Sequence, residues 1–490
     1  MKEYADYDAT ALAALVANGE VSADELLDAA LARAEAVNPK INAVVLLRED
    51  VARQSIRNGL PDGPFRGVPF LLKDLGAEAV DFPSHNGSRL SYGTVYGQNS
   101  AIFDKIKASG MVTFGRTTSP EGGIGAVTES AVYGGPTRNP WDLSRTSGGS
   151  SGGAGAAVAA RIVPMAHGTD GGGSVRIPAS SCGLFGFKAT RARFPDGPYY
   201  GEGWAGMAID GFLSRSVRDN AAMMDACAST DLGAPYVAPA MEVGFLGSIA
   251  RPPARLRVGL CETTFTGDAI DTECRAAVLA TGKLLADLGH HVEPYCPQAD
   301  HVGMMHAWTQ IVACGTAMGI NAKLAALGRA LQPDDVQGIS RGAMRYAETL
   351  SGADYLAAVG KIHAFGRQMA AAFAPIDILL SATLAEPPAE VGRFHHDRED
   401  FLAYRTGPGG VFAYSPFCAA FNASGQPAAT LPLHLSADGL PIGVHLAGKF
   451  GADEMLIALC AELEAARPWA HKRAALSYDN PRAVGGVEWS

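Results

Sequence analysis

Apolar residues in the first quarter of the chain change between helical and strand spacing. A capping-box pattern opens the run 22–39, whose apolar positions recur at helical spacing, so we expect a helix that ends near the proline closing this run. The run 41–47 is rich in branched residues and predicts a strand. A continuous apolar stretch at 67–72 predicts a buried strand, and a helix at 103–108 and a strand at 111–114 follow.

The middle of the chain places a long loop before further alternating elements. Residues 121–147 are rich in Gly, Thr and Pro and indicate a loop. The small-residue run 153–161 predicts a helix, and 163–165 predicts a short strand. After Gly183, short strands alternate with helices. Strands interleaved with helices are typical of the α/β class, and we predict a mixed β-sheet covered by helices on both faces.

The last third of the chain begins with long helical patterns and ends with strands. The patterns predict helices at 307–324 and 350–373, strands within 417–435 and 439–446, and a closing helix at 454–464. The stretch from about 300 to 400 therefore resembles a helical insertion or lid. We found no internal repeat, and the later strands are expected to join the same sheet. The prediction is one domain, 1–490, with a variable helical part.

Composition and charge narrow the classes of function. The formal net charge of −10 gives no electrostatic footprint for nucleic acid. The first ten residues mix acidic and polar side chains, and no uninterrupted apolar run is long enough to cross a bilayer, so we expect neither a secretory signal nor a membrane span. The eight cysteines are dispersed and form no CxxC pair, which argues against a structural zinc site and favours a reduced, cytoplasmic protein.

The segment 147–178 carries the candidate chemistry, because it holds two glycine-rich turns that each contain serine. In the second turn Gly171, Gly172 and Gly173 precede Ser174. Glycines let backbone N–H groups crowd around one point, as an oxyanion hole beside a serine nucleophile requires. A Gly/Ser cluster by itself is more typical of a turn or linker. A phosphate-binding loop is a further interpretation, but the P-loop, dinucleotide and GxSxG patterns are all incomplete here.

A serine nucleophile needs a base, and the residues alone leave two candidates open. His167 lies shortly before Ser174, although a single histidine beside a turn is more often structural. Lys73 follows a hydrophobic strand, and a lysine that loses its hydration has a lowered pKa and can act as a base. Its ordinary interpretation is an ion pair at a strand end. The residues alone do not choose between these.

Several motifs together resemble the amidase signature family. They are Gly67-Val-Pro-Phe-Leu-Leu-Lys-Asp74, Asn139-Pro-Trp141, Gly148-Gly-Ser-Ser-Gly-Gly153, Gly168-Thr-Asp170, Gly173-Ser-Val-Arg-Ile-Pro178, Gly186-Phe-Lys-Ala-Thr190, Arg215-Ser-Val-Arg-Asp219, Gly425-Gln-Pro-Ala428 and Gly439-Leu-Pro-Ile-Gly443. The resemblance covers almost the whole chain. It implies the amidase signature fold and a division of the single domain into N-terminal helices at 1–65, a catalytic core at 66–220, a variable helical substrate-binding part at about 300–410, and C-terminal strands and a helix at 411–475.

The resemblance also implies roles for individual residues. Lys73 matches the family's base, Ser150 its bridging serine after a cis peptide bond, and Ser174 its nucleophile. The oxyanion hole maps onto Gly171, Gly172 and Gly173 with the N–H of Ser174. Gly171 stands where many relatives carry a larger residue, so we expect a looser loop. His167 lies outside the family's triad.

The implied chemistry needs neither a metal nor an organic cofactor. The triad would form and then hydrolyse an acyl-enzyme. The pairs His290-His291 and His395-His396 are interpreted as polar surface loops rather than metal ligands. The expected partner is a small-molecule amide, with no nucleic acid or membrane, and a homodimer follows by family analogy only.

Within the family, several stretches are similar to the hydrolases of 6-aminohexanoate cyclic dimers, which degrade nylon oligomers. These include Asn139-Pro-Trp141, Ala166-His-Gly168 and Asn422-Ala-Ser-Gly-Gln-Pro427. We expect the substrate pocket to use Ile124, the segment 198–204 and the helical part at 300–400. Cys314 is a candidate pocket residue there, although a packed core cysteine is the more common case.

Four functional interpretations stay open at this point. The first is an amidase acting on linear or cyclic amides of the nylon-oligomer type. The second is a carbamate (urethane), anilide or ester hydrolase with the same triad. The third is the amidotransferase subunit that makes glutaminyl- or asparaginyl-tRNA, which needs partner subunits. The fourth is a nucleotide-binding module, for which the glycine loops lack a phosphate-contacting Lys or Arg.

Overall fold

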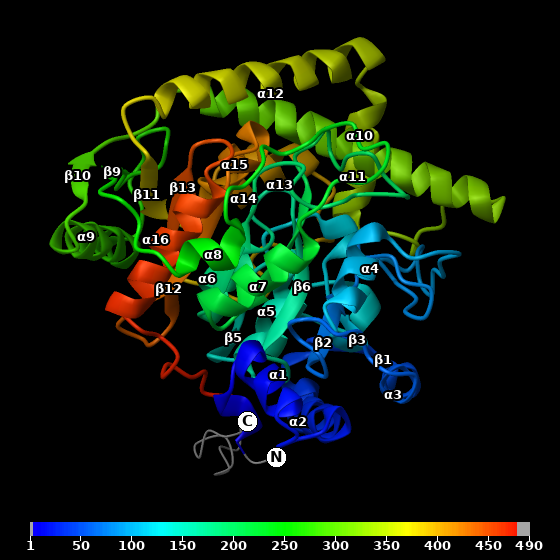
Figure 1. Ribbon diagram of the computed structural model, residues 1–490. Helices are drawn as coiled ribbons and strands as arrows, with labels where there is room; N and C mark the ends of the chain where they lie inside the picture. The colour runs from blue at the N-terminus through cyan, green and yellow to red at the C-terminus, as the bar shows by residue number, and fades with distance from the viewer. Residues whose placement is uncertain (1–2, 478–490) are drawn as a thin grey trace.

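A computed structural model describes residues 3–477, and eleven of its strands form one continuous sheet (Figure 1). The strand order is β1-β3-β2-β6-β8-β7-β12-β13-β11-β9-β10. Parallel pairs such as β2–β3 and antiparallel pairs such as β6–β8 both occur, so the sheet is mixed. The strands are β1 (Val44–Leu47), β2 (Pro69–Lys73), β3 (Val112–Thr117), β6 (Met165–Asp170), β7 (Phe185–Lys188), β8 (Ile209–Ser214), β9 (Arg257–Leu260), β10 (His291–Pro294), β11 (Ile378–Ala382), β12 (Ala428–Leu435) and β13 (Pro441–Gly448).

Helices cover both faces of the sheet. On one face α2 (Ala23–Ile41), α5 (Gly152–Ala159) and α6 (Arg176–Cys182) pack on the central strands and on one another. On the other face α7 (Val217–Cys227), α8 (Gly244–Ile249) and α16 (Asp453–Ala466) form a second layer. The remaining helices near the sheet are α1 (Ala9–Ala17), α3 (Glu49–Arg57), α4 (Ala101–Ala108) and α9 (Thr272–Asp287). The predicted α/β class and the mixed, doubly covered sheet are confirmed.

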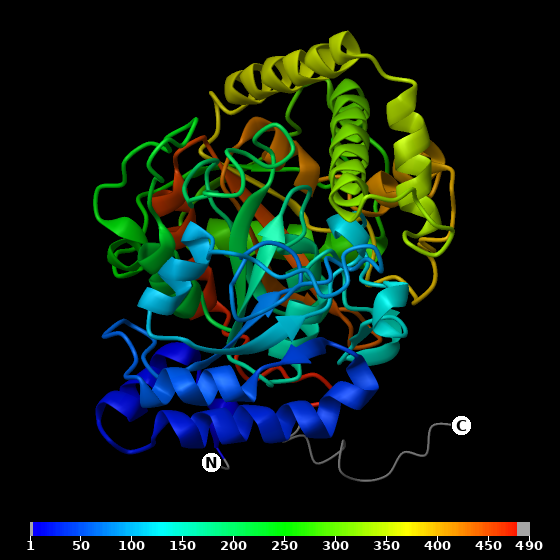
Figure 2. The same ribbon diagram turned by 90° about the vertical axis from the view of Figure 1, so that its right-hand side faces the viewer.

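A third group of helices lies beyond one end of the sheet (Figure 2). The group consists of α10 (His301–Leu327), α11 (Gly338–Glu348), α12 (Gly352–Ala372), α13 (Phe401–Thr406), α14 (Val411–Tyr414) and α15 (Cys418–Ser424). In Figure 1 the long helices α10 and α12 run across the upper part of the molecule, on the side opposite the N-terminal helices α1 and α2. The helices α10 and α12 agree with those predicted at 307–324 and 350–373, whereas β11 shows that the stretch from about 300 to 400 also contributes a strand to the main sheet.

Among residues 3–477, α10 is the one helix that is long and apolar enough to cross a membrane by length and composition alone. Its first half packs inside the protein, where Trp308 and Ile311 are buried. Its second half reaches the surface, where the Met318 side chain is 70 % exposed. The buried half of α10 is part of the protein core, where apolar segments of globular proteins commonly pack.

Three local predictions need correction. The helix α2 continues through Pro39 to Ile41, because Ile41 is fully buried in the core and Asn42 closes the helix with φ 49°. The predicted strand therefore shrinks to Val44–Leu47. The predicted loop 121–147 contains a small hairpin, β4 (Arg138–Asn139) with β5 (Asp142–Thr146), as well as the short 3-10 helices Glu121–Gly123 and Ala131–Tyr133.

The third correction concerns the start of the predicted strand 417–435. The chain forms α15 before β12 begins, because Cys418, Ala420 and Phe421 pack into the core on a helical face. The apolar run is short, and a buried helix and a buried strand have the same composition. The helix matters for the site, since it carries Asn422 to the centre of the molecule.

Candidate active site

Lys73 is the last residue of the buried strand β2, and it is fully enclosed. Its Nζ donates hydrogen bonds to Ser150 Oγ over 2.6 Å and to Thr169 Oγ1 over 2.8 Å. Burial lowers the pKa of Lys73 to about 7, while the charges of Asp170 and Asp210 act in the opposite direction. A substantial fraction of the amine is therefore neutral near neutral pH and can accept a proton.

His167 is hydrogen-bonded to the backbone of Lys73 and not to the candidate serines. The N–H of Lys73 donates to His167 Nδ1 over 3.3 Å, so the ring proton sits on Nε2 and is donated to Asp210 Oδ1 over 2.8 Å. The histidine is fully buried. This arrangement agrees with the prediction that His167 lies outside the triad, and it explains how β6 holds the end of β2.

The two candidate serines lie on neighbouring turns. The peptide bond between Gly149 and Ser150 is cis, as the family resemblance implied. The N–H of Ser151 donates to the carbonyl oxygen of Ser174 over 3.2 Å, which joins the two turns. Within residues 3–477 no hydrogen bond engages Ser174 Oγ, and catalytic hydrogen bonds commonly tighten only when substrate is bound.

The glycine loop after β6 presents unpaired backbone donors. In the described part of the chain, no acceptor is bound to the N–H groups of Gly171, Gly172 or Ser174. The N–H of Gly173 differs, because it donates to Asp170 Oδ1 over 2.8 Å. The N–H of Gly173 is therefore engaged by Asp170, and the other three N–H groups of the predicted oxyanion hole have no acceptor among residues 3–477.

A buried network below the loop fixes its shape. The Asp170 carboxylate accepts from Arg176 Nε and Nη2, each over 2.9 Å, and from the N–H of Val175 over 3.2 Å. Arg176 also donates to Asn422 Oδ1 over 2.7 Å, and its Nη1 lies 2.9 Å from His445 Nε2. The Arg176 charge holds the pKa of Asp170 well below its usual range, although burial alone would raise it. Charge-assisted bidentate contacts of this kind give a rigid geometry.

Two tryptophans pack directly on the glycine loop. A Cβ at Gly171 would lie 2.6 Å from the Trp204 ring, and one at Gly172 would lie 2.9 Å from Trp308 Cζ2. The Trp308 indole Nε1 donates to the carbonyl oxygen of Gly171 over 3.1 Å, and the two rings meet edge to face. The expectation of a looser loop at Gly171 is wrong, because Trp204 fills the space that a larger residue would take.

The two predicted pocket residues lie near this centre. A Cβ at Gly123 would lie 3.5 Å from Ser150 Oγ, and Ile124 is the next residue of this loop and is buried. Cys314 lies on α10, one residue before Gly315, where an added Cβ would lie 3.2 Å from Trp204 Cδ1. Cys314 is partly exposed, so it is no fully packed core cysteine.

Sequence reasoning assigned no role to Thr169, Asp170, Trp308 or Asn422. Thr169 and Asp170 stand inside a motif that was quoted for the resemblance, and their place just before the glycine loop was a usable signal. Asn422 opens a stretch that also carries the resemblance, but nothing in that stretch indicated its contact with Arg176. Trp308 had no such signal, since it is distant in the chain from the residue it contacts.

The histidine pairs are only partly at the surface. His290 and His396 are buried and bonded to Glu462 and Tyr404, which corrects the interpretation of both pairs as surface loops. Burial also lowers the pKa of His396 to about 4, so this ring is neutral at physiological pH. Among residues 3–477, no group of three or more His, Cys, Asp or Glu is arranged to hold a metal ion.

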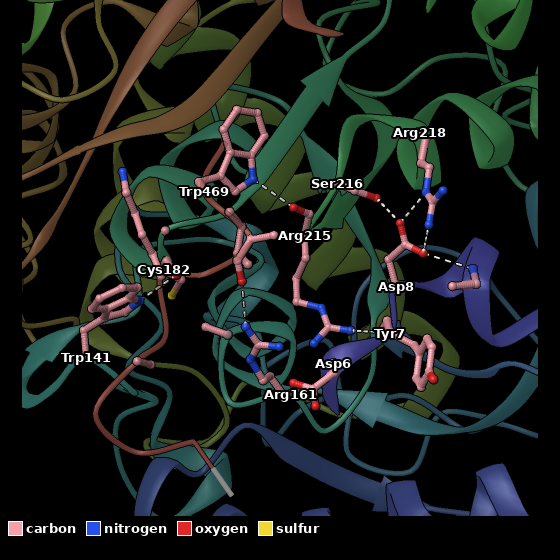
Figure 3. A pocket seen from close by; sticks show the side chains of 17 residues that line it. Asp6, Tyr7, Asp8, Trp141, Arg161, Cys182, Arg215, Ser216, Arg218 and Trp469 are labelled. Atoms are coloured by element: carbon pink, nitrogen blue, oxygen red, sulfur yellow. Dashed lines mark hydrogen bonds and ion pairs between the residues drawn. The ribbon is translucent and has the colours of Figure 1, made fainter. Parts of the chain in front are cut away.

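A separate cavity of about 280 Å³ lies under the N-terminal segment (Figure 3). Its labelled polar groups bind one another: Asp8 accepts from Ser216 and Arg218, and Trp469 donates to the Arg215 carbonyl over 2.8 Å. None of its lining residues belongs to the triad or the glycine loop. These contacts tie both ends of the described chain to the strand–helix junction at Arg215.

Comparisons with known proteins define the class. The family model described as Amidase matches residues 25–457, so the chain belongs to the amidase family. A 6-aminohexanoate-cyclic-dimer hydrolase from Paenarthrobacter ureafaciens is 38 % identical over 476 residues, covering 95 % of this chain and 96 % of the relative. The chain is an enzyme that hydrolyses amide C–N bonds, and it carries the amidase signature.

Two solved structures place the fold among such enzymes. The structure of a 6-aminohexanoate cyclic dimer hydrolase complexed with substrate matches with a TM-score of 0.90 at 36 % identity, over 96 % of this chain and 99 % of that one. A bacterial aryl acylamidase of the amidase signature family matches with a TM-score of 0.84 at 29 % identity, over 95 % and 97 % of the two chains.

Proposed function

We propose that the chain hydrolyses small linear or cyclic amides of the nylon-oligomer type through an acyl-enzyme on Ser174. The observation that carries the proposal is the buried, partly neutral Lys73, which lies 2.6 Å from Ser150 and next to a loop with three unpaired N–H donors. Amide hydrolysis needs a base, a nucleophile and stabilisation of the oxyanion, and these groups supply all three.

In the proposed first half-reaction, Ser174 Oγ attacks the amide carbonyl and gives its proton to Ser150 Oγ. Ser150 passes its own proton to Lys73 Nζ at the same time. The N–H groups of Gly171, Gly172 and Ser174 stabilise the tetrahedral oxyanion, a contribution of about 3–4 kcal/mol per donor in comparable sites. The relay then returns the proton to the nitrogen of the breaking C–N bond, so that a neutral amine leaves.

In the second half-reaction, water replaces the amine. The relay accepts a proton from the water as its oxygen attacks the acyl carbonyl, and Ser174 leaves with a proton returned by Ser150. The carboxylic acid product and free enzyme result. Every step uses groups of this chain and water, so the proposal needs no metal or organic cofactor.

The substrate class is proposed from the relatives, two of which, from Paenarthrobacter ureafaciens and a Pseudomonas species, are 6-aminohexanoate-cyclic-dimer hydrolases. An anilide is the second candidate, because the aryl acylamidase shares the fold over nearly the whole chain. Carbamates and esters would use the same serine chemistry. The tRNA-dependent amidotransferase subunit is the less favoured interpretation, and an isolated chain with amidase activity would argue against it.

Three further points stay predictions. The cytoplasmic location, with no membrane or nucleic-acid partner, rests on composition and charge. The homodimer rests on family analogy. Ile124 and Cys314 as pocket residues, and the division of the domain at residues 66, 300 and 411, rest on the resemblance and on the positions described above.

Hydrolysis of a panel of amides by the purified chain tests the proposal. The panel holds linear and cyclic 6-aminohexanoate dimers, a p-nitroanilide, an aryl carbamate and glutamine, each with wild type and Ser174→Ala. Serine-dependent amine release from a 6-aminohexanoate dimer is the expected result. Release from the anilide or carbamate alone would transfer the assignment to that class, and no release by the folded protein would refute the stand-alone amidase.

A further inference from the structure

One buried arginine in the helical part of the chain has no carboxylate partner among residues 3–477. Arg405 on α13 is only 3 % exposed, and its Nε is enclosed without a hydrogen-bond acceptor. Among residues 3–477 no carboxylate forms an ion pair with it. Burial lowers the pKa of Arg405 to about 10, with the neighbouring Tyr404 acting in the opposite direction, so the guanidinium is still charged at neutral pH.

Other buried arginines show what a satisfied guanidinium looks like in this fold. Arg176 is paired with Asp170, and Arg193 with Asp453. Arg116 donates to the backbone carbonyls of Phe82, Lys73 and Ala77 over 2.6–3.0 Å. Buried charges are costly unless they are paired and hydrogen-bonded. The unpaired state of Arg405 is therefore an exception that calls for a ligand.

Arg405 lies against the walls of the candidate active site. Its guanidinium carbon lies 4.2 Å from the centre of the Trp308 ring and 4.9 Å from that of Phe412. The edge of the same Trp308 ring contacts Gly172 and donates to Gly171. The aromatic faces hold the cation by cation–π attraction but leave its N–H donors unused.

The preceding residue anchors the same helix to the other loop of the site. The space at Gly125 is closed by Tyr404 Oη and His396 Nε2, at 2.7 Å and 2.9 Å from the Cβ that glycine lacks. Gly125 follows Ile124 in the loop that borders Ser150. Two consecutive residues of α13 therefore border the loop beside Ser150 and the tryptophan that packs on the glycine loop.

We propose that Arg405 binds a carboxylate carried by the amide substrate and so determines specificity for anionic amides. The inference rests on the proposed function and narrows its substrate class. A guanidinium presents a planar fork of donors that matches a carboxylate with two parallel hydrogen bonds. An amide bears such a group on its acyl part or on its amine part, and the experiment below distinguishes these two sources.

Three substrates of the same length separate the alternatives. N-hexylhexanamide is the neutral reference, N-hexanoyl-6-aminohexanoate carries the carboxylate on the amine part, and adipic acid mono-hexylamide carries it on the acyl part. Wild type is expected to hydrolyse one carboxylate compound at least about tenfold better in kcat/KM than the neutral amide. In Arg405→Met this ratio is expected to fall towards one, and Arg405→Lys should keep part of it.

Arg393→Met is the matched control. Arg393 also stacks on aromatic rings in this part of the chain, but it is paired with Glu386 over 2.6 Å. Its variant should keep the wild-type ratio. A folded Arg405→Met enzyme that retains the wild-type ratio, or a wild type that shows no preference for either carboxylate, would overturn the inference.

A binding measurement tests independently of turnover whether Arg405 binds a carboxylate. Calorimetric titration of wild type with hexanoate should give an affinity at least about tenfold higher than titration with hexan-1-ol, and Arg405→Met should lose that difference. Equal affinities in wild type would refute the role of Arg405 even if Arg405→Met failed to fold. If none of the amides is hydrolysed but hexanoate binds through Arg405, the proposed function fails and the anion site stands.

Discussion

The indole N–H of Trp308 donates a hydrogen bond to the carbonyl oxygen of Gly171 over 3.1 Å. Trp308 belongs to α10, and Gly171 begins the loop that precedes Ser174. The contact joins the helical part of the chain to the proposed oxyanion hole. A displacement of Trp308 would therefore strain this hydrogen bond at the start of the glycine loop.

Gly172→Ala should lower kcat/KM by about 10²–10³, which is the usual cost of losing one oxyanion donor. The new Cβ would lie 2.9 Å from Trp308 Cζ2, so either the ring or the loop has to move. The measurement is kcat/KM for the best amide of the panel. Gly319→Ala on α10 is the control, because nothing lies within 4 Å of that position. Normal activity of Gly172→Ala would show that the loop tolerates the shift.

Ser174→Ala should remove about six orders of magnitude of kcat, as loss of the nucleophile does in other serine hydrolases. The melting temperature should stay near the wild-type value, because Ser174 Oγ has no hydrogen bond to lose within residues 3–477. The exposed Ser144, replaced by alanine, serves as the control. Substantial residual turnover in a folded Ser174→Ala protein would show that another residue is the nucleophile.

Local patterns single out Lys73 and Ser174 as candidates, and the family resemblance, rather than the patterns, chooses Lys73 over His167 as the base and adds Ser150. A continuous apolar run precedes Lys73, and a glycine cluster precedes Ser174. Both patterns have a local physical cause, a buried strand in one case and close backbone packing in the other. The neighbouring residues in the sequence therefore indicate the positions of Lys73 and Ser174.

The walls of the site could not be predicted, because they are made by contacts between distant segments. Nothing around Trp308 or Arg405 distinguishes these residues from ordinary helical ones, and the motif that begins at Asn422 does not indicate what this residue contacts. Their roles arise only when α10, α13 and α15 meet the glycine loop and the network around Arg176. The apolar pattern predicts a strand where α15 forms, because short apolar runs fit both structures.

The pH profile should report the titration of Lys73. With a pKa of about 7, the neutral base is lost as the pH falls, so log kcat/KM should drop with unit slope below about pH 7 and level off above it. Lys73→Met should lose both the activity and this slope. The exposed Lys283, replaced by methionine, is the control. A wild-type profile that stays flat from pH 5 to about 9 would refute the assignment of Lys73 as the base.

The same shift predicts a change in stability with pH. The folded pKa of Lys73 lies below the unfolded value of about 10.4, so between pH 7 and about 10 the unfolded state binds more protons. The free energy of unfolding of wild type should therefore rise with pH relative to that of Lys73→Met across this window. Urea titrations of both proteins at several pH values measure this difference. A constant difference would mean that Lys73 is charged in the folded state throughout.

Asp170→Asn should cost about 3–5 kcal/mol of stability, because it leaves the Arg176 charge buried without a counter-ion. Both side chains are fully buried, and their bidentate contact also orients the N–H of Gly173.

Asp377→Asn is the matched control. Asp377 binds Arg257 and Lys449 near the surface, where ion pairs contribute at most about 1 kcal/mol. Urea denaturation measures the loss of stability in both variants. The kcat/KM of the folded Asp170→Asn protein shows whether the glycine loop keeps its catalytic geometry. Since the network holds the glycine loop from below, activity should fall together with stability. If Asp170→Asn were destabilised no more than Asp377→Asn, the buried pair would not be what fixes the loop, and Asn422 and His445 would have to hold Arg176 without it.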